Sequence, residues 1–205
     1  MSLPVAILAG GLATRLRPVT TRIPKILIDV AGRSFAEHQL TLLQRQGITR
    51  VVYCVGYLGE QVREALGDGA RWGMQLEYVF DGPKLLGTGG ALVRALEQLD
   101  ESFFVLYGDS YLTCDFVAVA EAYRRSGKSG LMTVFRNEGA WDRSNVAFAE
   151  GRILRYDKLA DAPEMRYIDY GLGILSRRTL AGICGAAGGN ERVVVSRGRT
   201  GAARR

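Results

Sequence analysis

Val5–Pro18, with the sequence VAILAGGLATRLRP, is the stretch that decides the fold. It begins with Val5–Leu8, an apolar run of strand length, and this run leads directly into the glycine pair Gly10-Gly11. Glycines adopt backbone conformations that other residues avoid, so consecutive N–H groups can point into an anion as a concave nest. The stretch therefore predicts a strand followed by a loop that holds something polyanionic.

Two common phosphate-binding motifs do not fit this stretch. A Walker A loop needs Lys-Ser/Thr directly after its last glycine, and none is present. The dinucleotide fingerprint needs a third glycine and a helix, which Pro18 and Pro24 prevent. What remains is an extended Gly-Gly-x-x-Thr-Arg loop, in which Arg15 offers a fork of donors and Lys25 a mobile charge to phosphate oxygens. A glycine turn with two surface cations stays an alternative.

An acidic residue follows the most apolar run of the chain. Ser102–Tyr107, with the sequence SFFVLY, ends abruptly in Gly108-Asp109. In open α/β sheets ligands bind at the carboxyl ends of the strands, and this is where Asp109 is expected. A lone carboxylate suits Mg²⁺, which takes few protein ligands and keeps its other positions for phosphates and water. A simple turn at the end of a strand is the alternative.

Apolar runs of strand length alternate with amphipathic helical stretches, which is the pattern of βα units on a mostly parallel sheet. We therefore predict an α/β protein. Ser34 is a plausible N-cap for the first helix. The predicted helices span residues 35–46, 59–66, 91–99 and 115–125. The predicted strands span residues 5–8, 26–30, 50–55, 75–80, 102–107 and 130–135, and then 146–149, 152–156 and 167–175 in a mixed-sheet half with a second ligand pocket.

The end of the chain differs in composition from the rest. Residues 1–184 are predicted to form one domain, and residues 185–205, rich in arginine, glycine and alanine, a flexible tail. Five arginines and one glutamate from residue 190 onward account for +4 of the net charge of +6. The body of the protein is thus close to neutral, and the overall charge does not indicate binding to nucleic acid.

The composition excludes several other classes. No apolar run is long enough to span a membrane, and the N-terminus lacks the features of a signal peptide. Three separated cysteines and one histidine, His38, give neither a zinc site nor a disulfide framework. We expect buried, reduced thiols in a cytoplasmic protein that binds neither membrane nor nucleic acid.

Three motifs in this order resemble the sugar-1-phosphate nucleotidyltransferase family. They are residues 8–18 with Pro24-Lys25, then Leu86–Ala91 with the sequence LGTGGA, then Tyr107–Asp109. LGTGGA is most similar to the branch of mannose- and heptose-1-phosphate guanylyltransferases. The resemblance covers about residues 4–183 and implies a Rossmann-like three-layer α/β/α nucleotidyltransferase fold with a mostly parallel mixed sheet.

The resemblance also implies an activity and the residues that perform it. The implied reaction is Mg²⁺-dependent in-line attack of a sugar 1-phosphate on the α-phosphate of an NTP, with GTP favoured, and a homo-oligomer is left open. Arg15 would grip the departing pyrophosphate, Lys25 would bind the reacting phosphates, and Asp109 would hold the metal. The implied nucleotide-binding residues are Leu8, Ala9, Gly10, Gly11, Gly87, Thr88 and Gly89. The implied sugar-phosphate residues are Asn145, Asp157, Lys158, Tyr170 and Gly171.

The sequence departs from the family at two places. Ala13 stands where the family usually has glycine, which would cost about 1 kcal/mol if the position needs a positive φ. Family members continue into a helix and a strand that bring a second acidic residue to the metal, and residues 185–205 match neither. We expect the domain to be incomplete at this end, and an out-of-frame reading of a GC-rich gene is one hypothesis that resequencing would test.

Rival functions follow from these observations. A catalytically impaired or silent homologue that still binds a nucleotide or sugar nucleotide is the main alternative. A nicotinamide-dependent dehydrogenase is disfavoured, because the third glycine and the acidic residue about twenty positions later are missing. A nucleic-acid-binding protein would rest on the tail alone.

Overall fold

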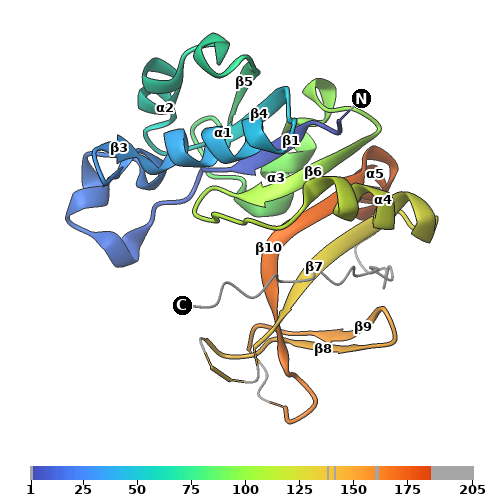
Figure 1. Ribbon diagram of the computed structural model, residues 1–205. Coiled ribbons are helices and arrows are strands. Elements are labelled where there is room, and N and C mark those ends of the chain that lie inside the picture. Colours follow the sequence, from blue (N-terminus) through green and yellow to red (C-terminus); the bar gives the residue numbers. More distant parts are fainter. Residues whose placement is uncertain (1, 138, 141, 160–161, 186–205) are drawn as a thin grey trace.

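The computed structural model describes residues 2–137, 139–140, 142–159 and 162–185 (Figure 1). The last helix, α5 (Arg177–Gly185), ends where this description ends. Our predictions for the tail, from residue 186 on, and for the side chain of Cys184 lie outside the described residues.

One eight-stranded sheet forms the centre of the structure and confirms the predicted fold class. β1 pairs in parallel with β4 and β6, and β4 pairs in parallel with β5, whereas β10 runs antiparallel to β6 and β7. The path through the sheet is β5 (Gln75–Phe80), β4 (Arg50–Val55), β1 (Val5–Leu8), β6 (Ser102–Tyr107), β10 (Tyr167–Ser176), β8 (Val146–Ala149) and β9 (Arg152–Tyr156), with β7 (Gly130–Arg136) also beside β10.

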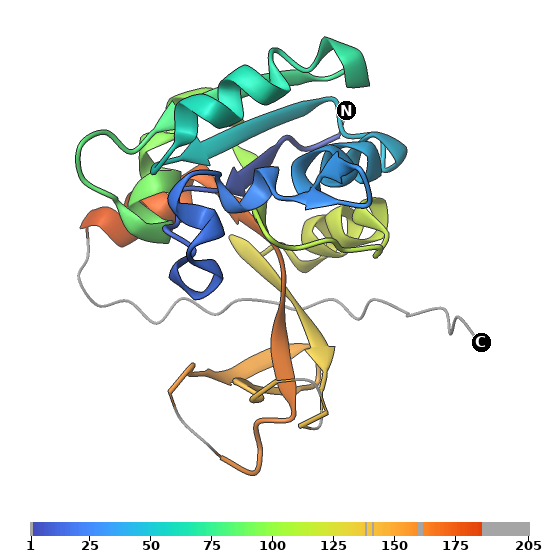
Figure 2. The same ribbon diagram turned by 90° about the vertical axis from the view of Figure 1, so that its left-hand side faces the viewer.

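Helices cover both faces of the sheet, because neighbouring residues of a strand point to opposite faces. Val5 and Ile7 of β1 pack in the core beneath α1 (Phe35–Arg45), α2 (Gly59–Leu66) and α4 (Phe116–Ser126). Ala6 packs in the second core, with α3 (Gly87–Arg94) and α5. Figure 2 shows α3 and α5 on one side of the strands and α1 and α4 on the other, which is the three-layer arrangement.

The second half of the chain forms a smaller part of the same sheet, called the smaller sheet below, that projects from this body (Figure 1). It consists of β8, β9 and the outer halves of β7 and β10. β10 is continuous through both parts, and its register with β7 shifts between Asp169 and Gly173. Such a bulge bends a strand locally. The predicted mixed-sheet half is therefore confirmed.

Most predicted helices are confirmed within one residue. Ser34 is the N-cap of α1 in a complete capping box with Glu37, and Gly47 after the helix has a φ of 73°. α4 begins after Asp115, whose side chain accepts from two backbone N–H groups. These ends follow local rules of capping and glycine conformation, so the sequence alone predicts them well.

Two predicted elements were wrong. The strand expected at residues 26–30 is a 3-10 turn followed by the two-residue strand β2 (Asp29–Val30), which pairs only with β3 (Arg33–Ser34). The helix expected at residues 91–99 is α3, which starts four residues earlier, at Gly87, and ends at Arg94. Glycine has low helix propensity, but packing of this helix on the sheet outweighs it.

Five 3-10 helices complete the regular structure of the described residues. Three of them follow β1, so the loop after the glycine pair contains no α-helix, as predicted. They are η1 (Thr14–Leu16), η2 (Val19–Thr21), η3 (Lys25–Leu27), η4 (Ala70–Trp72) and η5 (Leu96–Gln98). Of the helices in the described ranges, none has the length and apolar character to cross a membrane.

The core contains a buried hydroxyl group that can be removed as a test. The side chain of Tyr53 is 0% exposed, its ring stacks on that of Tyr78, and its hydroxyl has no hydrogen-bond partner in the described chain. An unpaired buried polar group costs about 1–3 kcal/mol. Tyr53→Phe is therefore expected to raise the free energy of unfolding by about 1 kcal/mol in urea denaturation.

Tyr78→Phe is the matched control. The Tyr78 hydroxyl donates to the carbonyl oxygen of Gly67 at 2.7 Å, so its removal is expected to lower the free energy of unfolding by about 1 kcal/mol. A loss of stability in Tyr53→Phe as well would contradict the interpretation.

Candidate active site

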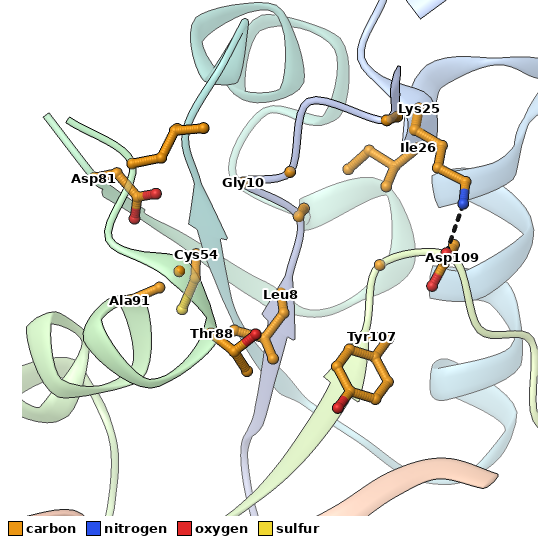
Figure 3. A pocket seen from close by; sticks show the side chains of 16 residues that line it. Leu8, Gly10, Lys25, Ile26, Cys54, Asp81, Thr88, Ala91, Tyr107 and Asp109 are labelled. Atoms are coloured by element: carbon orange, nitrogen blue, oxygen red, sulfur yellow. Dashed lines mark hydrogen bonds and ion pairs between the residues drawn. The ribbon is translucent and has the colours of Figure 1, made fainter. Parts of the chain in front are cut away.

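A cavity of about 350 Å³ opens at the carboxyl ends of β1, β4 and β6, where ligands bind in open α/β sheets. It is bounded by the loop after β1, the first turn of α3 and the turn after β6 (Figure 3). Eight residues with a predicted role in nucleotide, phosphate or metal binding line it: Leu8, Ala9, Gly10, Gly11, Lys25, Gly87, Thr88 and Asp109. Gly89 and Arg15, also assigned to this site from the sequence, do not line the cavity.

The glycine pair lines the cavity and carries two backbone N–H groups. Ala9 N–H donates to the Cys54 carbonyl oxygen, but the N–H groups of Gly10 and Gly11 make no hydrogen bond to any described residue. A side chain at Gly10 would come within 3.2 Å of the Asp81 carboxylate and the Gly56 nitrogen. The loop thus leaves two donors for an anion, as a phosphate-binding nest requires.

Ala13 adopts the left-handed conformation, with φ 45° and ψ 46°. This is the position where the family usually has glycine, so the expected strain is present. The Thr20 side chain is buried and its hydroxyl donates to the Ala13 carbonyl oxygen at 2.9 Å. That contact helps to hold the loop in this conformation.

Lys25 and Asp109 face each other on one side of the cavity (Figure 3). The Lys25 Nζ lies 2.5 Å from Asp109 Oδ2, and the two side chains are 39% and 51% exposed. An ion pair this exposed adds little stability. Both charges therefore remain available to a ligand, the lysine for phosphate oxygens and the carboxylate for a cation.

The site suits Mg²⁺ better than a metal with an all-protein ligand set. No group of three or more His, Cys, Asp or Glu side chains that could hold a metal ion is found among the described residues. Mg²⁺ commonly binds through one or two carboxylates together with substrate phosphates. Asp109, exposed at the edge of a cavity with anion-binding donors, fits that pattern.

The turn that carries Asp109 is packed tightly against β1. Gly108 N–H donates to the Leu8 carbonyl oxygen at 2.9 Å, and Ser110 N–H closes the turn onto the Tyr107 carbonyl oxygen at 3.0 Å. A β-carbon at Gly108 would lie 2.8 Å from the Leu8 oxygen. Only glycine lets the two strand ends approach this closely.

Asp81 lines the cavity opposite Lys25 and was not predicted from the sequence (Figure 3). It follows β5 directly and is 5% exposed. Its Oδ2 accepts from Leu86 N–H at 3.2 Å, whereas Oδ1 has no hydrogen-bond partner within the described ranges. An acidic residue immediately after the strand at 75–80 was the available signal, because Asp109 also lies just beyond the end of a strand, two residues after β6.

A second polar cluster lies beyond Tyr107, toward the smaller sheet. Lys158 Nζ is 5.9 Å from the ring centroids of both Tyr107 and Tyr156. The two tyrosine hydroxyls donate to Asp169 Oδ2 at 3.5 and 3.3 Å, and Asp169 N–H donates to Asn145 Oδ1 at 3.1 Å. The structure thus groups Lys158 and Asn145, two of the predicted sugar-phosphate residues, with Asp169, which the sequence analysis missed.

Burial keeps the two tyrosine hydroxyls of this cluster protonated. Burial first, and then the neighbouring Asp169 carboxylate, raise the pKa of Tyr156 to about 12. The pKa of Tyr107 is raised for the same two reasons, burial being the larger. Both hydroxyls are therefore protonated at neutral pH and remain hydrogen-bond donors.

The other predicted sugar-phosphate residues have structural contacts. Asp157 Oδ2 lies 3.2 Å from Arg155, and Asp157 Oδ1 accepts from Leu159 N–H. The ring of Tyr170 stacks on Phe135. Gly171 has a φ of 91° and lies against Ser110, so it supports the Asp109 turn from the side of β10. Whether these three residues contact a sugar stays a prediction.

Arg15 lies on η1, exposed to solvent. The loop that carries it nevertheless borders the cavity through Gly11 and Ala13. Its role in gripping pyrophosphate also stays a prediction.

The model of the family described as "Nucleotidyl transferase" matches residues 5–143. The chain is 33% identical over 132 residues to UTP--glucose-1-phosphate uridylyltransferase of Synechocystis sp., covering 59% of this chain and 34% of that protein. It is 30% identical over 181 residues to mannose-1-phosphate guanyltransferase beta-B of Xenopus laevis, covering 85% of this chain and 50% of that protein. The chain thus spans about a third to a half of the length of these relatives.

The fold is also similar to that of solved structures. The inositol-1-phosphate CTP transferase from T. maritima superposes with a TM-score of 0.74 at 21% identity, covering 95% of this chain and 78% of that one. At this identity the likeness concerns the fold, and it agrees with the Rossmann-like architecture predicted from the sequence.

The close approach at Gly108 gives a test of the site's construction. Gly108→Ala is expected to lower the free energy of unfolding by about 2 kcal/mol, because the new methyl group meets backbone atoms of Leu8 and Ala9 that cannot move separately. Gly11→Ala is the control, since its β-carbon meets nothing within 4 Å, and its change should stay within about 0.5 kcal/mol. Equal effects in urea denaturation would show that the contact is not tight.

Proposed function

The chain belongs to the nucleotidyl transferase family, and from this premise we propose that it joins an NTP and a sugar 1-phosphate into an NDP-sugar with release of pyrophosphate. The two relatives compared above are named as a uridylyltransferase and a guanyltransferase of sugar 1-phosphates. One observation carries the proposal: Gly10 and Gly11, whose N–H groups have no hydrogen-bond partner among the described residues, line one cavity with Lys25 and Asp109.

The proposed reaction requires the protein mainly to neutralise charge and to position the two substrates. A phosphate oxygen of the sugar 1-phosphate is already ionised at pH 7, so it can attack the α-phosphorus without a general base. Its new bond to phosphorus forms in line with the bond that breaks to the departing pyrophosphate. Both substrates are anions, so neutralising their charge and holding them in line are the main catalytic tasks.

The residues divide these tasks between the two sides of the cavity. The N–H groups of Gly10 and Gly11 would bind oxygens of the triphosphate, and Lys25 would leave Asp109 to pair with the reacting phosphates. Asp109 would hold Mg²⁺, which supplies positive charge at the phosphates when it is bound. Arg15 would reach the pyrophosphate from the loop after β1.

The second cluster would hold the sugar 1-phosphate. Lys158 offers a positive charge for its phosphate, and Asp169 offers an acceptor for sugar hydroxyls, held in place by Tyr107 and Tyr156. Tyr107 borders both this cluster and the cavity, so the two substrates would meet beside its ring. Asn145 would act through Asp169, because its Oδ1 accepts a hydrogen bond from the Asp169 N–H group.

Asp81 supports guanine as the preferred base. Among the common bases only guanine presents two adjacent donors, N1–H and N2–H₂, on its pairing edge, whereas the single N3–H of uracil is flanked by two acceptors. Oδ1 of a nearly buried carboxylate can accept from both guanine donors but would repel the uracil oxygens. GTP is therefore the proposed nucleotide.

A catalytically silent, nucleotide-binding homologue remains a second candidate. The observation that favours it is that Asp109 belongs to no group of three or more potential metal ligands within the described part of the chain. Retained nucleotide binding without turnover would support this candidate.

The proposal is tested by measuring pyrophosphate release with Mg²⁺ and a panel of NTPs and sugar 1-phosphates. Release is expected only when both substrates are present. Arg15→Ala should lower turnover about a hundredfold or more, as removal of a transition-state contact does, with an unchanged melting temperature. Arg22→Ala removes the same charge from the same exposed loop and should leave turnover within about twofold. Wild-type turnover in Arg15→Ala would refute the role of Arg15.

The base preference is tested separately with Asp81→Asn. Asparagine keeps an oxygen for Leu86 N–H but replaces the second acceptor by a donor. The ratio of kcat/KM for GTP to that for UTP is expected to exceed about tenfold in the wild type and to fall by at least about tenfold in the variant. An unchanged ratio would show that Asp81 does not read the base.

A further inference from the structure

We propose that Gln39 is a positioning residue for the carboxylate of Asp109. Its side-chain amide fixes the turn Tyr107–Ser110, and this turn determines where the carboxylate meets a divalent cation. The metal-binding half of this inference rests on the proposed function, whereas the fixing of the turn does not.

The contact joins parts of the chain that are far apart in sequence. Gln39 is on α1 and its side chain is 0% exposed. Its Nε2 donates to the Tyr107 carbonyl oxygen at 3.2 Å and to the Ser110 carbonyl oxygen at 2.8 Å. These two carbonyl groups flank Gly108 and Asp109, so one amide group bridges both ends of the turn.

The orientation of the amide follows from its partners. Two carbonyl oxygens can be satisfied only by the NH₂ end of the group, because the amide oxygen has no hydrogen to donate. That leaves Gln39 Oε1 buried, with no partner among the described residues. An unpaired buried oxygen costs free energy. A leucine or methionine would fill the space without that cost, so packing alone does not explain a glutamine at this position.

Gln39 is the only side chain within the described ranges that bonds to the backbone of this turn. The Asp109 side chain is half exposed, and its one ion-pair partner among the described residues is Lys25, which in the proposed function leaves it to bind phosphates. The place of the carboxylate therefore depends on the backbone of the turn. Mg²⁺ requires near-ideal octahedral geometry, so a looser turn would weaken its binding.

Gln46, the C-cap residue of the same helix, provides a matched control. It lies two helical turns after Gln39 and so on the same face of α1. Its Oε1 accepts from Phe116 N–H at 3.2 Å, at the start of α4. Removing this amide breaks a hydrogen bond between the end of α1 and the start of α4, which follows the Asp109 turn in the chain. It does not alter a contact of the turn itself.

The experiment compares wild type, Gln39→Met, Gln46→Met and Asp109→Asn. Amide hydrogen exchange of the metal-free proteins reports on the turn, and Mn²⁺ binding in the presence of GTP, followed by electron paramagnetic resonance, reports on the metal. In Gln39→Met, exchange at Gly108 and Ser110 should accelerate at least about tenfold. The dissociation constant for Mn²⁺ should rise about tenfold.

The Mg²⁺ dependence of turnover is a further readout, and a merely structural role of Gln39 would leave it unchanged. The Mg²⁺ concentration for half-maximal rate should rise in Gln39→Met, while kcat at saturating Mg²⁺ changes much less. Gln46→Met should match the wild type in exchange at the turn, in Mn²⁺ binding and in Mg²⁺ dependence. If Gln39→Met does not fold, Gln39→Asn, whose shorter side chain cannot reach both carbonyl groups, takes its place.

The outcomes separate the two proposals. Wild-type exchange at Gly108 and Ser110 in the Gln39 variant would overturn the inference. Unchanged Mn²⁺ binding in that variant, with binding lost in Asp109→Asn, would overturn it as well. If Asp109→Asn itself binds Mn²⁺ normally, the metal role in the proposed function fails, and faster exchange in Gln39→Met would still support the fixing of the turn.

Discussion

The parallel pairing of β1 with β6 is the constraint on which the rest of the site depends. Leu8 lies opposite Tyr107 in this register, and Gly108 N–H continues the ladder to the Leu8 carbonyl oxygen. Both strands therefore end at the same edge of the sheet. The glycine loop after one strand and the acidic turn after the other have to leave that edge side by side. Two residues about a hundred positions apart, Gly10 and Asp109, thereby line a single cavity.

Charge is distributed around this edge in a way that suits the two anionic substrates of the proposed reaction. Gly10, Gly11 and the exposed Lys25–Asp109 pair line the cavity, whereas Lys158, just after β9, and Asp169, on β10, form a separate cluster. Tyr107 stands between the two groups, with its ring near Lys158 and its hydroxyl on Asp169. β10 belongs to both parts of the sheet and, through its bulge, also brings Gly171 against the Asp109 turn.

The correct predictions of secondary structure came from local sequence patterns. Alternation and apolar runs predicted the strands around β1 and β6, and capping residues such as Ser34 predicted where helices begin. The errors came where tertiary packing outweighs propensity, as at the glycine-rich start of α3. The sequence analysis also overlooked Asp81, Asp169 and Gln39. Their importance lies in contacts with residues far away in the chain, which no local pattern reveals.

The sequence by itself determined the fold class, the family and the identity of the residues at the edge of the sheet, because these depend on strand periodicity and on short motifs. Only the tertiary structure decided which of those residues share a cavity. It placed Lys25 and Asp109 in contact, left Arg15 exposed outside the cavity, and set Tyr170 against Phe135. Strand register and helix packing fix such distances, and both arise only when segments remote in sequence bury their apolar faces against one another.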